Sequence, residues 1–197
     1  MVLDTTERLL PRASVMILSG SLPRGVPVNA YAQLVRMAEA AGVRALVDCD
    51  GPRFAEAVKA HPFLVKPNWH ELEQWAGATL KSIHEVRREA SRLSSITRGW
   101  VLVSMGERGA LLVFEPQLFS CQATAPRSKA VNTVGAGDAL LAAVAAQIQA
   151  TQPPEVWLRW GVAAGTAATR CEAGVLPTSR AMREVHREIR VKSYPAS

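Results

Sequence analysis

Long apolar runs are missing from this sequence of 197 residues. The run from Ala139 to Ala146 is among the longest, and Gln147 ends it far short of the roughly 20 residues that a membrane-spanning helix needs. Asp4 and Arg8 interrupt the N-terminal segment, where a secretory signal would require an unbroken apolar stretch. The sequence therefore predicts no membrane partner and no secretory signal.

Cysteine is scarce as well, with only three residues, Cys49, Cys121 and Cys171. Their odd number and wide spacing fit neither a disulfide framework nor a zinc knuckle. We expect buried structural thiols in a protein of the reducing cytoplasm.

Aromatic residues make up only 6% of the chain, and they do not alternate with the basic residues as single-strand nucleic-acid binding requires. The net charge is nevertheless +6, from 23 basic and 17 acidic residues. Arg87, Arg88 and Arg92, like the arginines between positions 180 and 190, have the spacing of a solvated helix face. We therefore expect no nucleic-acid partner, and a basic nucleic-acid binder ranks last among the alternatives.

Short segments rich in Val, Ile and Leu alternate with longer amphipathic segments. This alternation is typical of a parallel sheet whose two faces are covered by helices. We predict a single α/β domain over residues 1–197, a three-layer α/β/α fold with a mainly parallel sheet. Strands are expected at 15–19, 43–48, 63–66, 100–104, 110–114 and 118–122, and helices at 29–41, 53–60, 68–76, 82–95, 139–150 and 154–170, with a last helix from Thr178-Ser179 to the Tyr194-Pro195 tail.

The most informative segment is the run Asn132-Thr133-Val134-Gly135-Ala136-Gly137-Asp138. Its small residues leave the backbone bare, and a predicted helix begins directly after them, with unpaired N–H groups and partial positive charge at its first turn. Such a turn can bind an anion. A carboxylate beside an anion site needs a reason, and abstraction of a proton during phosphoryl transfer supplies one.

Other interpretations of this segment remain open on the residues alone. It could be an ordinary helix N-terminus with a favourable acid, Asp138, in its first turn. A dinucleotide-binding turn is less suitable because Leu140 stands where its third glycine is needed, and a Walker loop would require a Gly-Lys-Ser/Thr sequence.

Residues 131–139 resemble the second signature of the PfkB/ribokinase-like carbohydrate kinases. The resemblance implies that Asp138 is the catalytic base, that Gly135, Ala136 and Gly137 form the anion hole, and that the fold is ribokinase-like. Asn132-Thr133 looks closer to the phosphofructokinase and tagatose-6-phosphate kinase branch. ATP and Mg²⁺ are the cofactors that this family implies.

Four further segments agree with the family in the expected order, although each has a simpler interpretation. Residues 18–25 resemble a loop beside the sugar, or form a plain strand-to-helix turn. Residues 66–73 resemble the Asn-x-x-Glu motif of a water-mediated Mg²⁺ site, or form a capping box. Residues 103–109 resemble the nucleotide loop, or form a hairpin turn, and residues 161–174 resemble adenine-flanking helices, or reflect close helix packing. The implied site residues are Ser19, Gly20 and Ser21 for the substrate, Asn68 and Glu71 for the metal and nucleotide, and Ser104, Gly106 and Gly109 for the nucleotide.

The family's N-terminal strands, which form a lid over the sugar, have no counterpart in this sequence. Residues 1–10 instead resemble the end of a helix that leads into the strand at 15–19. We therefore expect the C-terminal portion of a kinase domain that lacks its lid. The implied reaction is transfer of the ATP γ-phosphoryl group to a primary hydroxyl of a sugar phosphate, such as fructose 1-phosphate or tagatose 6-phosphate. A kinase for another substrate class and a non-catalytic nucleotide-binding remnant stay open, as does a homodimer.

Overall fold

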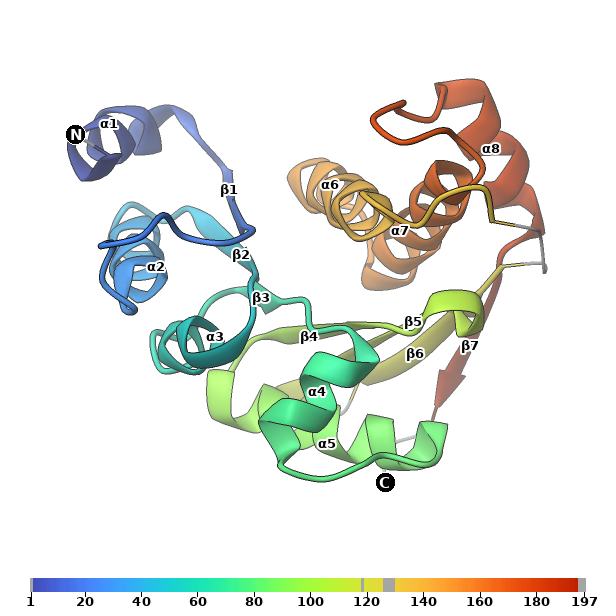
Figure 1. Cartoon of the computed structure of the whole chain (residues 1–197), viewed down its shortest axis with the longest axis horizontal. Helices are drawn as coiled ribbons and strands as arrows, with labels where there is room; N and C mark the ends of the chain where they lie inside the picture. Colours follow the sequence, from blue (N-terminus) through green and yellow to red (C-terminus); the bar gives the residue numbers. More distant parts are fainter. Residues whose placement is uncertain (1, 118, 126–129, 195–197) are drawn as a thin grey trace. The chain divides into compact units, whose positions relative to one another are not determined.

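The computed structural model describes residues 2–117, 119–125 and 130–194. They form two compact units, which are treated separately (Figure 1). Among these residues, unit 1 comprises 2–103, 113–117 and Phe119, and unit 2 comprises Ser104–Leu112, 120–125 and 130–194. The single domain expected over residues 1–197 stays a prediction.

Unit 1 is built on parallel strands that neighbour one another in chain order: β1 (Val15–Ser19), β2 (Arg44–Asp48), β3 (Leu64–Val65) and β4 (Trp100–Ser104). The registers align Ser19 with Asp48 and Val47 with Val65, so the carboxyl ends of β1, β2 and β3 meet at one edge of the sheet. Leu46, Leu64 and Val101 are completely buried. Burial from both sides explains the apolar residues at the centres of β2, β3 and β4, whereas in β1 Ile17 is 43% exposed.

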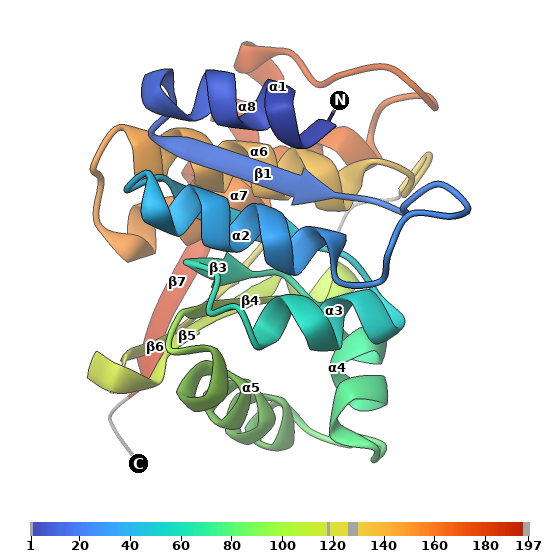
Figure 2. The ribbon, with the colours of Figure 1, turned by 90° about the vertical axis from the view of Figure 1, so that its left-hand side faces the viewer.

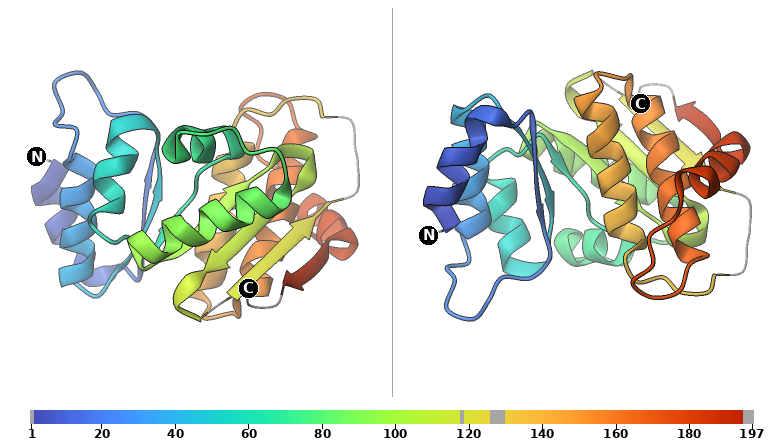
Figure 3. Two further views of the ribbon diagram at one scale, coloured as in Figure 1. Left: turned by 90° about the horizontal axis from the view of Figure 1, so that it is seen from below. Right: turned by 90° about the horizontal axis from the view of Figure 1, so that it is seen from above.

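Helices α2, α3 and α5 of unit 1 bury apolar residues, whereas α1 buries none and α4 buries only Leu72. In α2, the buried Tyr31, Leu34, Val35 and Ala38 recur at helical spacing. Helices α2 and α3 pack on each other and on β2 (Figure 2), and α4 packs on α5 (Figure 3, left). Their bounds, with that of α1, are α1 (Val2–Leu9), α2 (Ala30–Ala40), α3 (Gly51–Val58), α4 (Trp69–Ala76) and α5 (Ile83–Thr97).

Unit 2 combines a small sheet with three helices, in which α6 and α7 lie side by side and α8 packs on α7 (Figure 3, right). Two glycines of α7 permit the close approach: a Cβ on Gly161 would lie 2.7 Å from Val144 Cγ2, and one on Gly165 would lie 3.1 Å from Ala136 O. Close helix packing therefore accounts for Gly161 and Gly165, and the adenine-flanking role of residues 161–174 stays a prediction. The helices are α6 (Ala136–Gln149), α7 (Pro154–Thr169) and α8 (Ser179–Glu188), and the strands are β5 (Ala110–Phe114, which begins in this unit), β6 (Phe119–Thr124) and β7 (Arg190–Tyr194).

Strand β7 corrects the expected C-terminal tail. Residues 190–194 pair antiparallel with β6, and the Tyr194 hydroxyl donates to Gln122 Oε1 at 2.7 Å. Only Val191 and Tyr194 are apolar in this segment, so its sequence carries no strand pattern and pairing with β6 determines the conformation. The strand predicted at 118–122 is β6, displaced toward the C-terminus, and Leu118 lies outside the described residues.

Two smaller expectations also change. Helix α3 begins at Gly51, earlier than the predicted residue 53, because Pro52 occupies its first turn, where a missing N–H costs nothing. Cys49 and Cys121 are buried free thiols as expected, but Cys171 is only half-buried. Within the described ranges, each helix is too short or too polar to cross a bilayer.

Candidate active site

The carboxyl ends of β1 and β2 in unit 1 place the predicted substrate loop beside an acidic residue. Gly20, with φ of +90°, donates its N–H to Asp48 O at 3.0 Å, and Ser19 and Ser21 are exposed next to it. The buried Tyr31 hydroxyl donates to both Ser19 O and Gly20 O, at 3.0 Å each. The loop is therefore held by its backbone, and the Ser19 and Ser21 hydroxyls lie on its surface. Their role in substrate binding stays a prediction.

A buried ion pair lies at the same edge of the sheet. Lys66 follows β3, and its Nζ lies 3.1 Å from Asp48 Oδ2, with side-chain exposures of 6% and 16%. The neighbouring Cys49 thiol is buried, and this burial, with the charges of Asp48 and Asp50, raises its pKa to about 12. Cys49 is therefore a neutral thiol near pH 7 and lacks the thiolate that a nucleophile needs. The sequence did not reveal the Lys66–Asp48 pair, although Asp48 ends β2 and Lys66 directly follows β3, at the carboxyl edge where ligands bind in open α/β sheets.

Removing one partner of this pair is expected to leave the other charge buried and unpaired. Lys66→Met should lower the free energy of unfolding by about 3 kcal/mol, measured by urea denaturation. The matched control is the exposed pair Lys59–Glu56, with Nζ–Oε1 of 2.6 Å and side-chain exposures of 66% and 34%. Lys59→Met should cost less than about 1 kcal/mol. Equal costs for the two variants would contradict a stabilising role for burial of the Lys66 charge.

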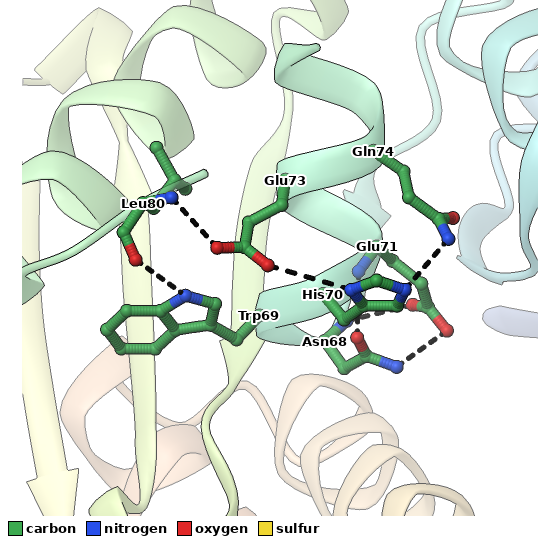
Figure 4. Close-up of polar contacts among 7 residues, drawn as sticks. All are labelled: Asn68, Trp69, His70, Glu71, Glu73, Gln74 and Leu80. Carbon is green, nitrogen blue, oxygen red and sulfur yellow. Dashed lines mark hydrogen bonds and ion pairs between the residues drawn. The ribbon is translucent and has the colours of Figure 1, made fainter. Parts of the chain in front are cut away.

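Asn68 and Glu71 form a complete capping box at the start of α4 (Figure 4). Glu71 N donates to Asn68 Oδ1 at 2.8 Å, Asn68 N donates to Glu71 Oε2 at 2.8 Å, and Asn68 Nδ2 donates to Glu71 Oε1 at 2.7 Å. Two further hydrogen bonds join α4 to Leu80, in the segment after the helix (Figure 4). Leu80 N donates to Glu73 Oε1 at 2.8 Å, and Trp69 Nε1 donates to Leu80 O at 3.2 Å. The local interpretation of Asn68 and Glu71 is thus confirmed, and it leaves the Glu71 carboxylate in one fixed orientation.

The surroundings of Glu71 fit a divalent cation held through water. Burial is the main cause that raises the pKa of Glu71, Asp48 and Asp50 add to it, and the Asn68 N–H and Lys66 act against it. A carboxylate crowded by two others is suited to a hard cation. Among the residues that the structure places, no group of three carboxylate, imidazole or thiol side chains is arranged to hold an ion directly. Binding of Mg²⁺ by Glu71 through water stays a prediction.

Unit 2 contains a cavity of about 330 Å³ that joins two of the predicted motifs. Ser104, Gly106 and Gly109 line it from the segment after β4, and Ala136 and Gly137 line it from the first turn of α6. These two segments are separated by more than 25 residues in the chain, yet they share one cavity wall. The predicted nucleotide loop and the predicted anion hole therefore lie together.

Gly109 shows why the nucleotide loop requires glycine. Its φ is +80°, and a Cβ would lie 1.9 Å from Ala123 O, so β6 leaves no room for a side chain. Gly106 has φ of +57° with nothing within 4 Å of its Cβ position, so conformation alone favours glycine there. The bond from Met105 N to Gly109 O, 2.8 Å, closes the turn. The loop thus presents backbone to the cavity.

The first turn of α6 has the geometry expected of an anion-binding turn. Gly135 is the N-cap in the left-handed region with φ of +79°, and the first i to i−4 bond runs from Ala139 N to Gly135 O at 2.9 Å. The Gly137 N–H lies before that bond, in the first turn, where N–H groups have no partner within the helix. Gly137 also lines the cavity. Asn132 shapes the preceding turn, since its Oδ1 accepts from Val134 N at 3.1 Å.

Asp138 lies directly after these residues, in the first turn of α6, and its side chain is exposed. It neighbours the cavity in the chain without lining it. An exposed carboxylate at this position can meet a hydroxyl brought by a ligand, and its role as the base stays a prediction. Thr133, already part of the Asn132-Thr133 pair, also lines this cavity. Two further lining residues, Thr166 and Thr169 of α7, were not singled out from the sequence, because they lie among small residues that indicated helix packing.

The sequence and the fold of this chain are similar to those of known proteins. The chain is 31% identical over 182 residues to 1-phosphofructokinase of Bacillus subtilis, covering 92% of this chain and 59% of the relative. It is 42% identical over 153 residues to 1-phosphofructokinase of Xanthomonas campestris, covering 75% and 47%. The crystal structure of phosphofructokinase-2 from Escherichia coli in complex with potassium aligns with a TM-score of 0.85 and 31% identity, over 93% of this chain and 60% of that one.

The chain thus spans between about half and three fifths of the length of these relatives. The likeness to solved kinases confirms the three-layer α/β/α, ribokinase-like fold. The model of the pfkB family carbohydrate kinases matches residues 2–180, so this chain belongs to that family.

Proposed function

We propose that this chain carries the nucleotide-binding and phosphoryl-transfer part of an ATP-dependent sugar-phosphate kinase of the 1-phosphofructokinase type. One observation carries the proposal: the loop with Gly106 and Gly109 and the α6 turn with Ala136 and Gly137 line one cavity. A glycine-lined loop beside a helix N-terminus is suited to the phosphates of a nucleotide. The named relatives favour fructose 1-phosphate as the acceptor, and tagatose 6-phosphate is the second candidate.

The reaction assigns separate tasks to the residues of unit 2. An oxygen of the acceptor's primary hydroxyl forms a bond to the γ-phosphorus of ATP, while the bond from that phosphorus to the β,γ-bridging oxygen breaks and ADP leaves. Asp138 accepts the hydroxyl proton. The Gly135–Gly137 backbone donates N–H groups to the oxygens of the transferring phosphoryl group, where charge is concentrated.

The residues of unit 1 have supporting tasks in this proposal. Asn68 keeps the Glu71 carboxylate in place by donating a hydrogen bond to each of its two oxygens, and Glu71 holds the water shell of Mg²⁺. When bound, Mg²⁺ neutralises phosphate charge. Hydrogen bonds from the Tyr31 hydroxyl to Ser19 O and Gly20 O fix the loop 19–21. The Ser19 and Ser21 hydroxyls of this loop bind the sugar.

The test is a panel of acceptors with the purified chain, ATP and Mg²⁺, followed by ADP release and by identification of the phosphorylated product. We expect ATP binding by calorimetry and product from fructose 1-phosphate in preference to tagatose 6-phosphate, ribose and adenosine. Product from ribose or adenosine alone would move the chain to another substrate class. Absence of ATP binding would contradict the proposal as a whole.

A second function is favoured by the position of Asp138, which does not line the cavity shared by the two glycine segments. It is nucleotide binding without transfer. Saturable ATP binding with no product from any acceptor of the panel, and only slow hydrolysis, would support it.

A further inference from the structure

A second cavity, of about 320 Å³, lies within unit 1 at the edge of the sheet opposite Asp48 and Lys66. Its walls include Arg44, the first residue of β2, Phe63, just before β3, and Trp100, the first residue of β4. Because these strands are parallel, their amino ends share one edge. No part of the phosphoryl-transfer proposal uses this cavity.

The cavity has an aromatic wall. Trp100 and Phe114 both line it and stack on each other, with ring centroids 4.6 Å apart and an interplanar angle of 18°. Phe63 lies beside them, and the Arg44 guanidinium carbon is 5.4 Å from the centroid of its ring. Stacking on Phe63 positions a cation at an otherwise apolar wall. A ligand for this wall has a flat or apolar body.

Three basic side chains border the same space, and all three are exposed: Arg44, His61 and Arg98. Glu39 is the single acidic residue among the lining residues. Two guanidinium groups against one carboxylate leave net positive charge at this cavity. Guanidinium groups are suited to phosphate and carboxylate oxygens.

His61 and Arg98 are in an uncommon backbone conformation, with φ of +55° each. Among the described non-glycine residues only Thr151, with φ of +53°, shares it. Glycine would adopt this conformation without strain, so a histidine and an arginine there are costly choices. Both strained residues line the cavity, and Thr151 does not.

Hydrogen bonds join the segment of His61 to the segment of Arg98. His61 Nδ1 lies 3.3 Å from Thr97 O, and Thr97 Oγ1 donates to Pro62 O at 3.4 Å. A Cβ on Gly99 would lie 2.2 Å from Pro62 O, so the backbones are in contact. These contacts fix the backbone conformation of His61 and Arg98, and so they fix the points from which both side chains extend.

We propose that this cavity binds a small organic anion, with one phosphate or carboxylate group held by Arg44 and Arg98 and a flat or apolar body against Phe63 and Trp100. The volume is at the lower limit of ligand sites, which favours a small ligand. Glu39 favours a ligand that also carries a hydroxyl or amine donor.

The probes separate the two parts of the ligand. Phenyl phosphate and benzoate carry ring and anion, phenol carries the ring alone, and inorganic phosphate carries the anion alone. Calorimetry with the whole chain should show saturable binding of phenyl phosphate or benzoate, and weaker binding of phenol and inorganic phosphate. Binding of one ring-bearing anion only identifies the ligand as a phosphate or as a carboxylate.

Arg98→Gly is the informative variant because glycine relieves the left-handed strain while the guanidinium is removed. We expect thermal stability at or above that of the parent and at least about tenfold weaker binding of the ring-bearing anion. Thr151→Gly is the matched control, which relieves the same strain outside the cavity and should leave binding unchanged. The proposal is wrong if neither ring-bearing anion binds, or if Arg98→Gly binds it as the parent does. The second outcome would assign the binding to the cavity of unit 2.

Discussion

Replacing Asp138 by asparagine is expected to reduce phosphoryl transfer about a thousandfold, within the range of general-base catalysis, and to leave ATP affinity unchanged. Asparagine keeps the size of the side chain and its capacity to accept a hydrogen bond, but it cannot take the proton of the acceptor hydroxyl. The measurements are kcat with the preferred acceptor and the dissociation constant of ATP by calorimetry. Loss of turnover with intact binding would identify Asp138 as the base.

A control is needed because Asp138 also stabilises the first turn of α6 as an acid near a helix N-terminus. Glu155 occupies the first turn of α7, so Glu155→Gln removes the same kind of charge from a neighbouring helix. The two variants should lose similar stability, about 0.5 kcal/mol, and only Asp138→Asn should lose turnover. Near-normal turnover by Asp138→Asn would remove Asp138 from the mechanism.

Gly109→Val is expected to lower the free energy of unfolding by at least about 4 kcal/mol. The Cβ would lie 1.9 Å from Ala123 O, so strand β6 must move, and the φ of +80° adds strain for a β-branched residue. Gly106→Val is the matched control in the same loop, with φ of +57° and nothing within 4 Å of its Cβ position. It should cost only about 1–2 kcal/mol, the price of the left-handed conformation.

Urea denaturation of both variants measures these costs, with the slope of the transition checked for a change in the unfolded state. ATP affinity should fall with Gly109→Val because the nucleotide loop moves with β6. If Gly109→Val and Gly106→Val are destabilised equally, the contact with Ala123 does not determine the requirement for glycine, and conformation alone explains it.

The sequence predicts most of this fold because the relevant signals are local. Asn68, Ser82 and Thr178 cap their helices through side-chain bonds to residues three positions ahead, and each was recognisable as a cap or helix start. Strands β4 and β5 were placed at their correct bounds because they are apolar at almost every position. Strand β7 was missed because its conformation depends on a partner far away in the chain.

The candidate site also has features that the sequence predicts and features that depend on contacts between distant segments. The glycine-rich turns at Gly106 and Gly135 are visible in the sequence, since φ values that only glycine adopts easily leave a composition signal. The pairing of Asp48 with Lys66 depends on the register of β2 and β3, which no local pattern encodes. The basic cavity near Arg98 is equally invisible, because its residues come together only when three strands align their amino ends.

Gly165 lies in the middle of α7, yet the nearest atom to its missing side chain is Ala136 O, 3.1 Å from the Cβ position, in the turn that precedes Asp138. The spacing of α6 and α7 and the shape of the α6 turn are therefore mechanically coupled in unit 2. A methyl group at position 165, which also lines the cavity, would displace the Ala136 carbonyl and with it the turn that leads to Asp138. Substitution at this helix contact is thus expected to alter the proposed phosphoryl-transfer site from the far side of the helix pair.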